Sequence, residues 1–235
     1  MTAMKAVIMA AGEGKRMRPL THNIPKPLIE INGKPFLYYL IKNIMQSGIK
    51  DIGIVVGYKS EMIKKFLDEN RIKATLIQQD KQRGTGHAVS VCRHFVGTSE
   101  FITVNGDDLY SEHDIRRMQI PGRVNYIAGF EHNTPEKYGV LMEENGFLKE
   151  IIEKPTIALS KIVNTGLYKF TPEIFQALSY IRESERGELE LTDAVTLLAK
   201  QKKVKVLRIR GYWLGIGCRE DIKRVSKIMI EKNIV

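Results

Sequence analysis

The sequence predicts an α/β fold, a doubly wound and mostly parallel mixed sheet flanked by helices. Two observations carry this prediction. Short apolar runs alternate with helical patterns three times within roughly the first hundred residues. In the second half the strand candidates follow one another more closely, which indicates a β-rich extension. With 235 residues, 43% of them hydrophobic, the chain is long enough to bury a substantial core.

The first half is expected to begin with a strand at 5–10 that ends in a glycine loop. Apolar residues at helical spacing then predict a helix at 36–47, closed by Gly48. In such a sheet ligands bind at the carboxyl ends of the strands, so the glycine loop, the 79–85 segment and Asp107 should converge on one crevice. The remaining elements expected here are strands at 51–58, 75–79 and 101–105 and helices at 61–70 and 86–95.

The second half is expected to hold a hairpin, because Asn145-Gly146 separates two strand-like runs at 138–143 and 147–153. We interpret the chain as a single domain, 1–235, with one half at about 1–120 and the other at about 121–235. The other elements expected are strands at 123–130, 162–170 and 204–209 and helices at 172–182, 190–201 and 219–232.

The composition excludes several protein classes. No apolar run is long enough to cross a bilayer, and the amino terminus lacks the pattern of a secretory leader. Cys92 and Cys218 lie far apart, so they predict neither a disulfide framework nor a structural zinc site. A cytoplasmic protein is therefore expected.

The net charge of +10 raises the question of nucleic-acid binding. The densest basic stretch, at 200–210, covers a helix end and a strand whose alternate residues would face solvent at a sheet edge. No aromatic residues interleave it as a base-stacking platform would require. We therefore expect no nucleic-acid or membrane partner. Binding of a small polyanionic substrate is left as an alternative explanation of the positive charge.

The loop after the first predicted strand carries the clearest chemical signal. Gly12 and Gly14 are followed by cations at 15, 16 and 18, but Met17 stands where a dinucleotide-binding fingerprint needs a third glycine. Backbone N–H groups and cations together favour a triphosphate, whereas glycines alone often mark only a turn. Further on, prolines at 25 and 27 hold Lys26 rigidly, which suits a fixed charge aimed at a phosphate.

These segments resemble the signature of the sugar-1-phosphate nucleotidyltransferases, also called nucleotide-sugar pyrophosphorylases. The resemblance covers nearly the whole chain and follows the family's order of motifs. The matching segments are AAGEGKRMRPLT (10–21), KPL (26–28), QRGTGHA (82–88), NGD (105–107), YGV (138–140), EKP (153–155), NTGLY (164–168), GELELTDAV (187–195) and WLGIG (213–217).

The resemblance implies a Rossmann-like nucleotide-binding half, a sugar-binding extension and a Mg²⁺-assisted reaction. A sugar-1-phosphate oxygen would attack the α-phosphorus of a nucleoside triphosphate and release pyrophosphate. Arg16 would stabilise the departing pyrophosphate, Lys26 would bridge the reacting phosphates and Asp107 would bind Mg²⁺. By the same resemblance the nucleotide would contact Ala10, Ala11, Gly12, Gly14, Lys15, Gln79, Gln82, Gly84 and Thr85, and the sugar phosphate Gly139, Glu153, Lys154, Asn164 and Thr192, with Asp193 beside it.

One position departs from the family pattern. The family usually has Asp or Asn two residues after the motif's tryptophan as a second Mg²⁺ ligand, and here that residue is Gly215. Asp108 would be a substitute, although adjacent residues on an extended strand point to opposite faces. A water molecule or a phosphate oxygen would be another. Weakened catalysis, an engineered variant and a protein that only binds nucleotide sugars are the three explanations left open.

The substrates also stay open. The segment 79–88 is most similar to UTP-using N-acetylglucosamine-1-phosphate members, whereas RGELELTD (186–193) favours glucose-1-phosphate thymidylyl- or uridylyltransferases. UTP or dTTP is the expected nucleotide, and a homo-oligomer is left open. The chain's length leads us to expect no appended acyltransferase domain. We expect Trp213 to serve packing and the five histidines to have no metal-binding role.

Overall fold

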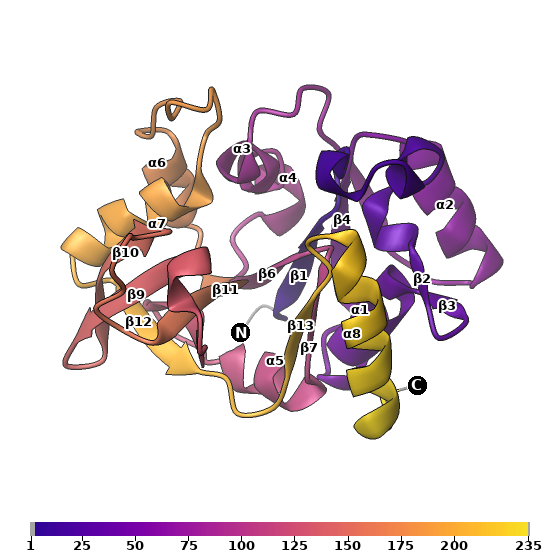
Figure 1. Ribbon diagram of the computed structural model, residues 1–235. Helices are drawn as coiled ribbons and strands as arrows, with labels where there is room; N and C mark the ends of the chain where they lie inside the picture. Colours follow the sequence, from indigo (N-terminus) through magenta and orange to yellow (C-terminus); the bar gives the residue numbers. More distant parts are fainter. Residues whose placement is uncertain (1–2, 235) are drawn as a thin grey trace.

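The computed structural model describes residues 3–234 and has a nine-stranded mixed sheet at its centre (Figure 1). Four strands form its parallel part, in the order β5 (Thr75–Gln78), β4 (Asp51–Val56), β1 (Lys5–Met9) and β6 (Phe101–Asn105). The side chains of β1 and β4 are almost entirely apolar and buried, as a strand covered on both faces requires.

The rest of the sheet is largely antiparallel. β11 (Ile162–Phe170) pairs antiparallel with β6, and beyond it follow β8 (Asn125–Glu131), β12 (Val204–Arg208), β10 (Phe147–Glu153) and β9 (Gly139–Glu144). The expected hairpin joins β9 to β10, with φ values of 51° at Asn145 and 77° at Gly146. An α/β fold with a mixed sheet is therefore confirmed.

Helices cover both faces of the sheet, and each face has its own apolar core (Figure 1). Alternation along β1 divides its side chains, since Ala6 and Ile8 enter one core and Val7 enters the other. The first core includes α1 (Phe36–Gln46), α2 (Ser60–Glu69), α5 (Glu112–Met118) and α8 (Arg219–Glu231), and the second α3 (Thr85–Ser90), α4 (Arg93–Val96), α6 (Ile174–Leu178) and α7 (Leu191–Lys200).

A buried cation lies where the parallel and antiparallel parts meet. Lys169 on β11 has no exposed surface, and its ammonium group donates to Glu100 Oε1 at 2.8 Å and to two backbone carbonyl oxygens, at 2.8 and 3.0 Å. A buried charge is tolerated only when it is paired and hydrogen-bonded. This network therefore fixes the end of β11 that lies opposite the crevice described below.

Several short elements were not expected from the sequence. They include a small hairpin of β2 (Glu30–Ile31) and β3 (Lys34–Pro35), and a second pair of β7 (Asp108–Tyr110) and β13 (Trp213–Gly215). Strands of two or three residues are too short to produce a recognisable period. The helix α5 and four 3₁₀ turns, η1 (Lys15–Met17), η2 (Leu20–His22), η3 (Lys26–Leu28) and η4 (Pro135–Lys137), were also missed.

Three expectations need correction. The helix expected at 86–95 is divided into α3 and α4, because the Cys92 N–H turns to Val89 O at 3.0 Å in a tighter turn. The helix expected at 172–182 is only the five residues of α6. The basic strand at 204–209 is not an edge, since β12 lies between β8 and β10.

Local partners explain the charges around β12 without a ligand. Lys203 pairs with Glu173 at 3.2 Å, Arg208 pairs with Glu143, and the Lys205 ammonium lies over the Phe147 ring. In residues 3–234, no helix combines the length and apolar character needed to span a lipid bilayer.

Candidate active site

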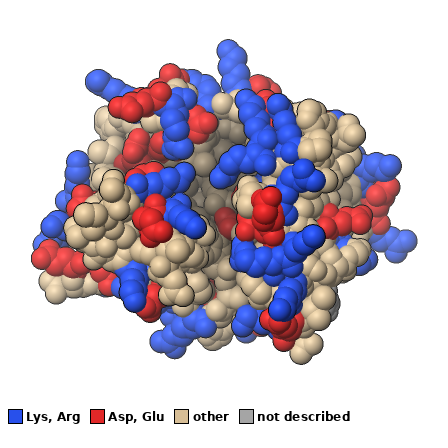
Figure 2. All heavy atoms as spheres, in the orientation of Figure 1, with Lys and Arg blue, Asp and Glu red and all other residues tan. Residues whose placement is uncertain are grey.

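Two adjoining cavities lie at the carboxyl ends of β1 and β6. The larger has a volume of about 950 Å³ and the smaller about 360 Å³. Arg16 and Asp107 line both of them, as do Met9 and Glu188, so the two form one crevice. Figure 2 shows this hollow near the middle of one face, with Lys and Arg side chains gathered on both sides of it.

The glycine loop forms the wall of the smaller cavity. Gly14 has a φ of 64°, and a Cβ at this position would come within 3.0 Å of Thr21 and 3.1 Å of Lys26. The Thr21 hydroxyl donates to the Gly14 carbonyl at 2.9 Å and holds the loop in this position. A glycine is needed here for both reasons, the left-handed backbone and the close approach of Lys26.

Lys26 is buried, with 7% of its surface exposed, between the two prolines that the sequence singled out. Its ammonium group is paired with Asp107, which lies in the turn after β6 and keeps a third of its side-chain surface exposed. The pair balances the cost of burying the ammonium. Lys26 and Asp107, 81 residues apart, thus meet at the border of the two cavities.

The 79–85 segment lies beside the crevice, but not all of it lines a cavity. Gln79 is 4% exposed, and its amide lies 2.9 Å from His87 Nδ1. Gln82 reaches the smaller cavity and donates to Ala11 O at 2.8 Å. Thr85 lines the larger cavity, and its hydroxyl accepts from the Leu191 N–H at the start of α7. This segment therefore also ties the two halves of the chain together.

The larger cavity is bounded by β9, β10 and an irregular stretch of β11. The pairing of β11 with β8 shifts between Asn164 and Tyr168, where Gly166 has a φ of 79°. The Asn164 side chain accepts from the Gly166 N–H at 2.9 Å and donates to the Tyr168 hydroxyl at 2.6 Å. This bulge directs polar groups from the middle of a strand into the cavity.

Aromatic rings line the far side of the larger cavity. Trp213 lies 5.4 Å from Tyr138 and 5.9 Å from Phe130, measured between ring centroids, and His132 lies 4.7 Å from Tyr138. Burial and the positive charge of Arg224 lower the pKa of His132. Trp213 was expected to serve packing; it does pack against the first core, and it also lines the cavity.

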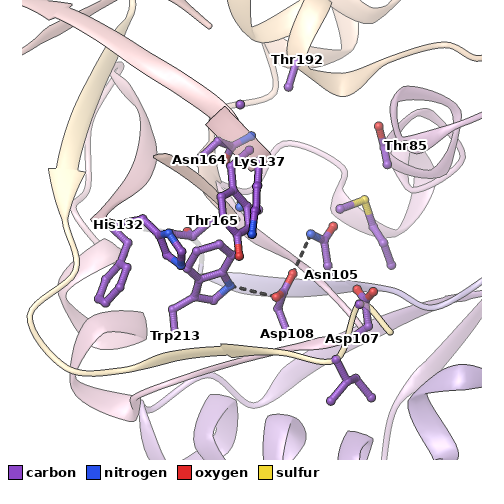
Figure 3. Close-up of a pocket in the computed structure, with 18 of the residues that line it drawn as sticks. Thr85, Asn105, Asp107, Asp108, His132, Lys137, Asn164, Thr165, Thr192 and Trp213 are labelled. Carbon is purple, nitrogen blue, oxygen red and sulfur yellow. Dashed lines mark hydrogen bonds between the residues drawn. The ribbon is translucent and has the colours of Figure 1, made fainter. Parts of the chain in front are cut away.

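Asp108 is a buried carboxyl group beside Asp107 (Figure 3). Its Oδ1 accepts from the Trp213 indole N–H at 2.8 Å, and its Oδ2 accepts from the Asn105 amide at 2.9 Å. Burial, together with the nearby charge of Asp107, raises the pKa of Asp108 to about 7, although these two hydrogen bonds and Lys26 act in the opposite direction.

Most of the expected site residues lie together. Ala11, Gln79 and Gly84 line neither cavity, and a Cβ on Gly84 would come 2.6 Å from Leu189 O, so this glycine serves packing. The smaller cavity is lined by Ala10, Gly12, Gly14, Lys15, Arg16, Lys26, Gln82 and Asp107, and the larger by Arg16, Thr85, Asp107, Gly139, Glu153, Lys154, Asn164, Thr192 and Asp193.

Sequence reasoning missed several cavity residues. Asn105, Arg186 and Glu188 could have been found from the NGD and RGELELTD motifs that contain them. Nothing in the sequence marks others, which include Lys137 in η4 and Asp221, Arg224 and Lys232 on or after α8, because they reach the larger cavity only through the fold.

The donor set suits Mg²⁺ in part. Asp107 offers a partly exposed carboxylate at the crevice, the hard oxygen ligand that Mg²⁺ prefers. Within residues 3–234, no cluster of three or more His, Cys, Asp or Glu side chains is arranged to hold a metal. A Mg²⁺ ion held at Asp107 would therefore take most of its ligands from phosphates and water.

Comparison with known proteins decides the family. Residues 5–232 match the nucleotidyl transferase family. The chain belongs to this family. The resemblance to sugar-1-phosphate nucleotidyltransferases is confirmed.

Two curated relatives have bifunctional names. The chain is 38% identical over 232 residues to the "Bifunctional protein GlmU" of Methanocaldococcus jannaschii, and 40% identical over 226 residues to the "Bifunctional sugar-1-phosphate nucleotidylyltransferase/acetyltransferase" of Sulfurisphaera tokodaii. These matches cover 97% and 95% of the chain but 55% of each relative. The chain thus spans about half the length of these nucleotidyltransferase relatives.

Solved structures of similar fold match this chain over nearly their whole length. A putative glucose-1-phosphate thymidylyltransferase from Bacillus anthracis superposes with a TM-score of 0.86 at 27% identity, covering 96% of this chain and 95% of that one. A UDP-glucose pyrophosphorylase complexed with UDP-glucose gives the same score and identity, with coverages of 98% and 100%.

The raised pKa of Asp108 predicts a pH-dependent effect of the Asp108→Asn substitution on stability. The bound proton stabilises the folded state fully below the unfolded-state pKa of 3.8, and this contribution is lost as the pH rises through about 7. We expect the variant to gain stability relative to the wild type between about pH 5 and about pH 8. Urea unfolding in EDTA at both pH values measures this, and an unchanged difference would contradict it.

Proposed function

We propose that this protein joins a nucleoside triphosphate, UTP or dTTP, to a hexose-1-phosphate and releases pyrophosphate. Glucose-1-phosphate and N-acetylglucosamine-1-phosphate are the acceptors we favour. One observation carries the proposal: a cation-lined glycine-loop cavity and a larger polar and aromatic cavity meet at Arg16 and Asp107. Two phosphorylated substrates that must react with each other need this arrangement.

The smaller cavity suits the triphosphate. Lys15, Arg16 and Lys26 line it together with the backbone of Gly12 and Gly14. At 4 Å, two unit negative charges repel by about 4 kcal/mol at an effective dielectric of about 20, so bringing two phosphate groups together requires cations. Fixed cations and backbone N–H groups reduce this repulsion without reorganising during the reaction.

The reaction needs no covalent enzyme intermediate. A phosphate oxygen of the sugar-1-phosphate forms a bond to the α-phosphorus, while the bond from that phosphorus to the pyrophosphate oxygen breaks. Lys26 would bridge the two reacting phosphates, and Arg16 would stabilise the charge that develops on the leaving pyrophosphate. When bound at Asp107, Mg²⁺ would supply further neutralisation of phosphate charge.

The larger cavity suits the sugar phosphate. Glu153 and Asn164 offer hydroxyl-binding groups, and the Glu153 carboxylate would lie 3.0 Å from a Cβ at residue 139, so Gly139 leaves this side open. Lys154, next to Glu153, would meet the phosphate. The division into a nucleotide-binding half at about 1–120 and a sugar-binding half at about 121–235 is part of this proposal, as is the doubly wound, Rossmann-like character of the first half.

A non-catalytic protein that binds nucleotide sugars is the second candidate, because Gly215 stands where the resemblance led us to expect a metal ligand. Both candidates require substrate binding, so binding does not separate them. Turnover does.

Pyrophosphate release tests the proposed reaction. The chain with Mg²⁺ is assayed with UTP, dTTP, CTP, ATP and GTP, each against glucose-1-phosphate, N-acetylglucosamine-1-phosphate and mannose-1-phosphate. We expect release only with a triphosphate and a sugar phosphate together, and most with UTP or dTTP. Substrate binding by folded protein without release from any pair would instead support the non-catalytic candidate.

Arg16→Gln should reduce kcat, because the charge on departing pyrophosphate would lose a cation that lines both cavities. Loss of one such group costs about 100-fold or more in kcat. Arg18→Gln is the matched control, since Arg18 pairs with Glu13 at 3.2 Å and lines neither cavity. Equal losses in the two variants would refute the role of Arg16.

Glu153→Gln should raise the KM for the sugar-1-phosphate by about tenfold or more, because a charge-assisted hydrogen bond to the sugar is lost. The KM for the triphosphate should stay unchanged. Glu150→Gln, a substitution of an exposed residue on the same strand that lines neither cavity, is the control. A change in both KM values for Glu153→Gln would show that the residue acts on the whole crevice rather than on the sugar.

A further inference from the structure

Asp107 and Asp108 are consecutive, yet both line the larger cavity (Figure 3). On a continuous strand they would point to opposite faces. Here β6 ends at Asn105, Asp107 lies in the turn, and Asp108 is the first residue of β7. The turn interrupts the alternation, so two carboxyl groups reach the same cavity.

Gly215 lies directly opposite Asp108 in the antiparallel pair of β7 and β13. A Cβ at 215 would come 2.6 Å from Asp108 Oδ1, while the next neighbours would be at 3.7 and 3.9 Å, an ordinary contact distance. The φ of Gly215 is not in the left-handed range, so its backbone does not require glycine. Among the described residues, the Asp108 carboxylate is thus the one close obstacle to a Cβ at 215.

The Asp108 carboxylate is held in a fixed orientation. Trp213 donates to one oxygen and Asn105 to the other. A carboxylate can accept about four hydrogen bonds or ligand contacts, so each oxygen retains a lone pair after these two contacts. Trp213 lies two residues before Gly215 on β13. Its hydrogen bond holds the Asp108 carboxylate in the space that a side chain at 215 would otherwise occupy.

We propose that Asp108 supplies the second carboxylate of the reaction centre, acting with Asp107 toward the divalent cation, and that Gly215 is small in order to admit it. The proposal rests on the proposed function. In this arrangement β7 provides, through Asp108, the carboxylate that Gly215 on β13 cannot provide. Gly215 then indicates that the second carboxylate comes from the neighbouring strand, and it does not indicate a loss of catalytic activity.

The structural alternative is that Asp108 only accepts hydrogen bonds from Trp213 and Asn105. Asparagine at 108 separates the two roles. Its carbonyl oxygen still accepts from Trp213, and its amide group can donate to Asn105 once the Asn105 amide turns over, while the negative charge is removed. A hydrogen-bonding role tolerates this substitution, whereas binding of a hard divalent cation does not.

Trp213 provides a direct readout of metal binding. It is the single tryptophan of the chain, and its indole N–H contacts the Asp108 carboxylate. Mn²⁺ bound at Asp107 and Asp108 would therefore quench the intrinsic fluorescence. Mn²⁺ is titrated first alone and then with UTP, into the wild-type chain, Asp108→Asn and the control Asp68→Asn, which alters an exposed carboxylate on α2.

We expect saturable quenching in the wild type and in Asp68→Asn, and an apparent Kd for Mn²⁺ that is at least about tenfold weaker in Asp108→Asn. Far-UV circular dichroism and a cooperative thermal transition establish that each variant is folded. Wild-type affinity in folded Asp108→Asn, or absence of quenching in the wild type in both titrations, would overturn the proposal. The titration with Mn²⁺ alone does not depend on turnover, so failure of the proposed reaction would be recognised separately.

A reciprocal exchange tests the role of Gly215. Gly215→Asp alone adds a carboxylate to occupied space, so it should lower the melting temperature and should not tighten Mn²⁺ binding. Asp108→Ala with Gly215→Asp moves the carboxylate to the paired strand and should bind Mn²⁺ within about threefold of the wild type, whereas Asp108→Ala alone should not. Tighter Mn²⁺ binding by Gly215→Asp alone would overturn the proposal, since it would mean that the site lacks a carboxylate.

Discussion

The antiparallel pairing of β11 with β6 is the interaction on which the candidate site depends. It joins a parallel sheet, whose strand ends carry the glycine loop and Asp107, to an antiparallel sheet that forms the wall of the larger cavity. One end of β11 is fixed by the buried Lys169, and near the other a bulge turns Asn164 toward the cavity. The two cavities adjoin because this one strand belongs to both parts of the sheet.

Charge compensation governs the interior of the crevice. Cations that suit phosphate groups are costly to bury without partners, and Lys26 is paired with Asp107. Asp108 lies deeper, and its charge is opposed by burial and by Asp107. Under the proposed function, Lys26 and Asp107 would exchange this pairing for contacts with phosphate and a divalent ion.

The short β7–β13 pair has a larger effect than its length suggests. It brings Trp213 and Gly215, near the carboxyl end of the chain, against Asp108. Asp114 holds the segment that leads into β13, because its carboxylate accepts from the backbone N–H groups of Arg210 and Gly211 at 2.9 and 2.8 Å. A segment far from the glycine loop in the sequence thereby lines the same crevice.

The sequence by itself determined the family, the α/β class, most of the long strands and helices, and the groups lining the glycine-loop cavity, because these depend on local periodicity and contiguous motifs. Only the tertiary structure decided that β12 is interior, that Gln79 is buried, that Gly84 packs closely against Leu189, and that Trp213 lines the cavity. It also decided that Asp108 fills the space beside Gly215. The physical reason is that strand order, burial and steric exclusion depend on contacts between residues far apart in the chain. A local sequence pattern does not indicate which of these distant side chains will occupy the same space.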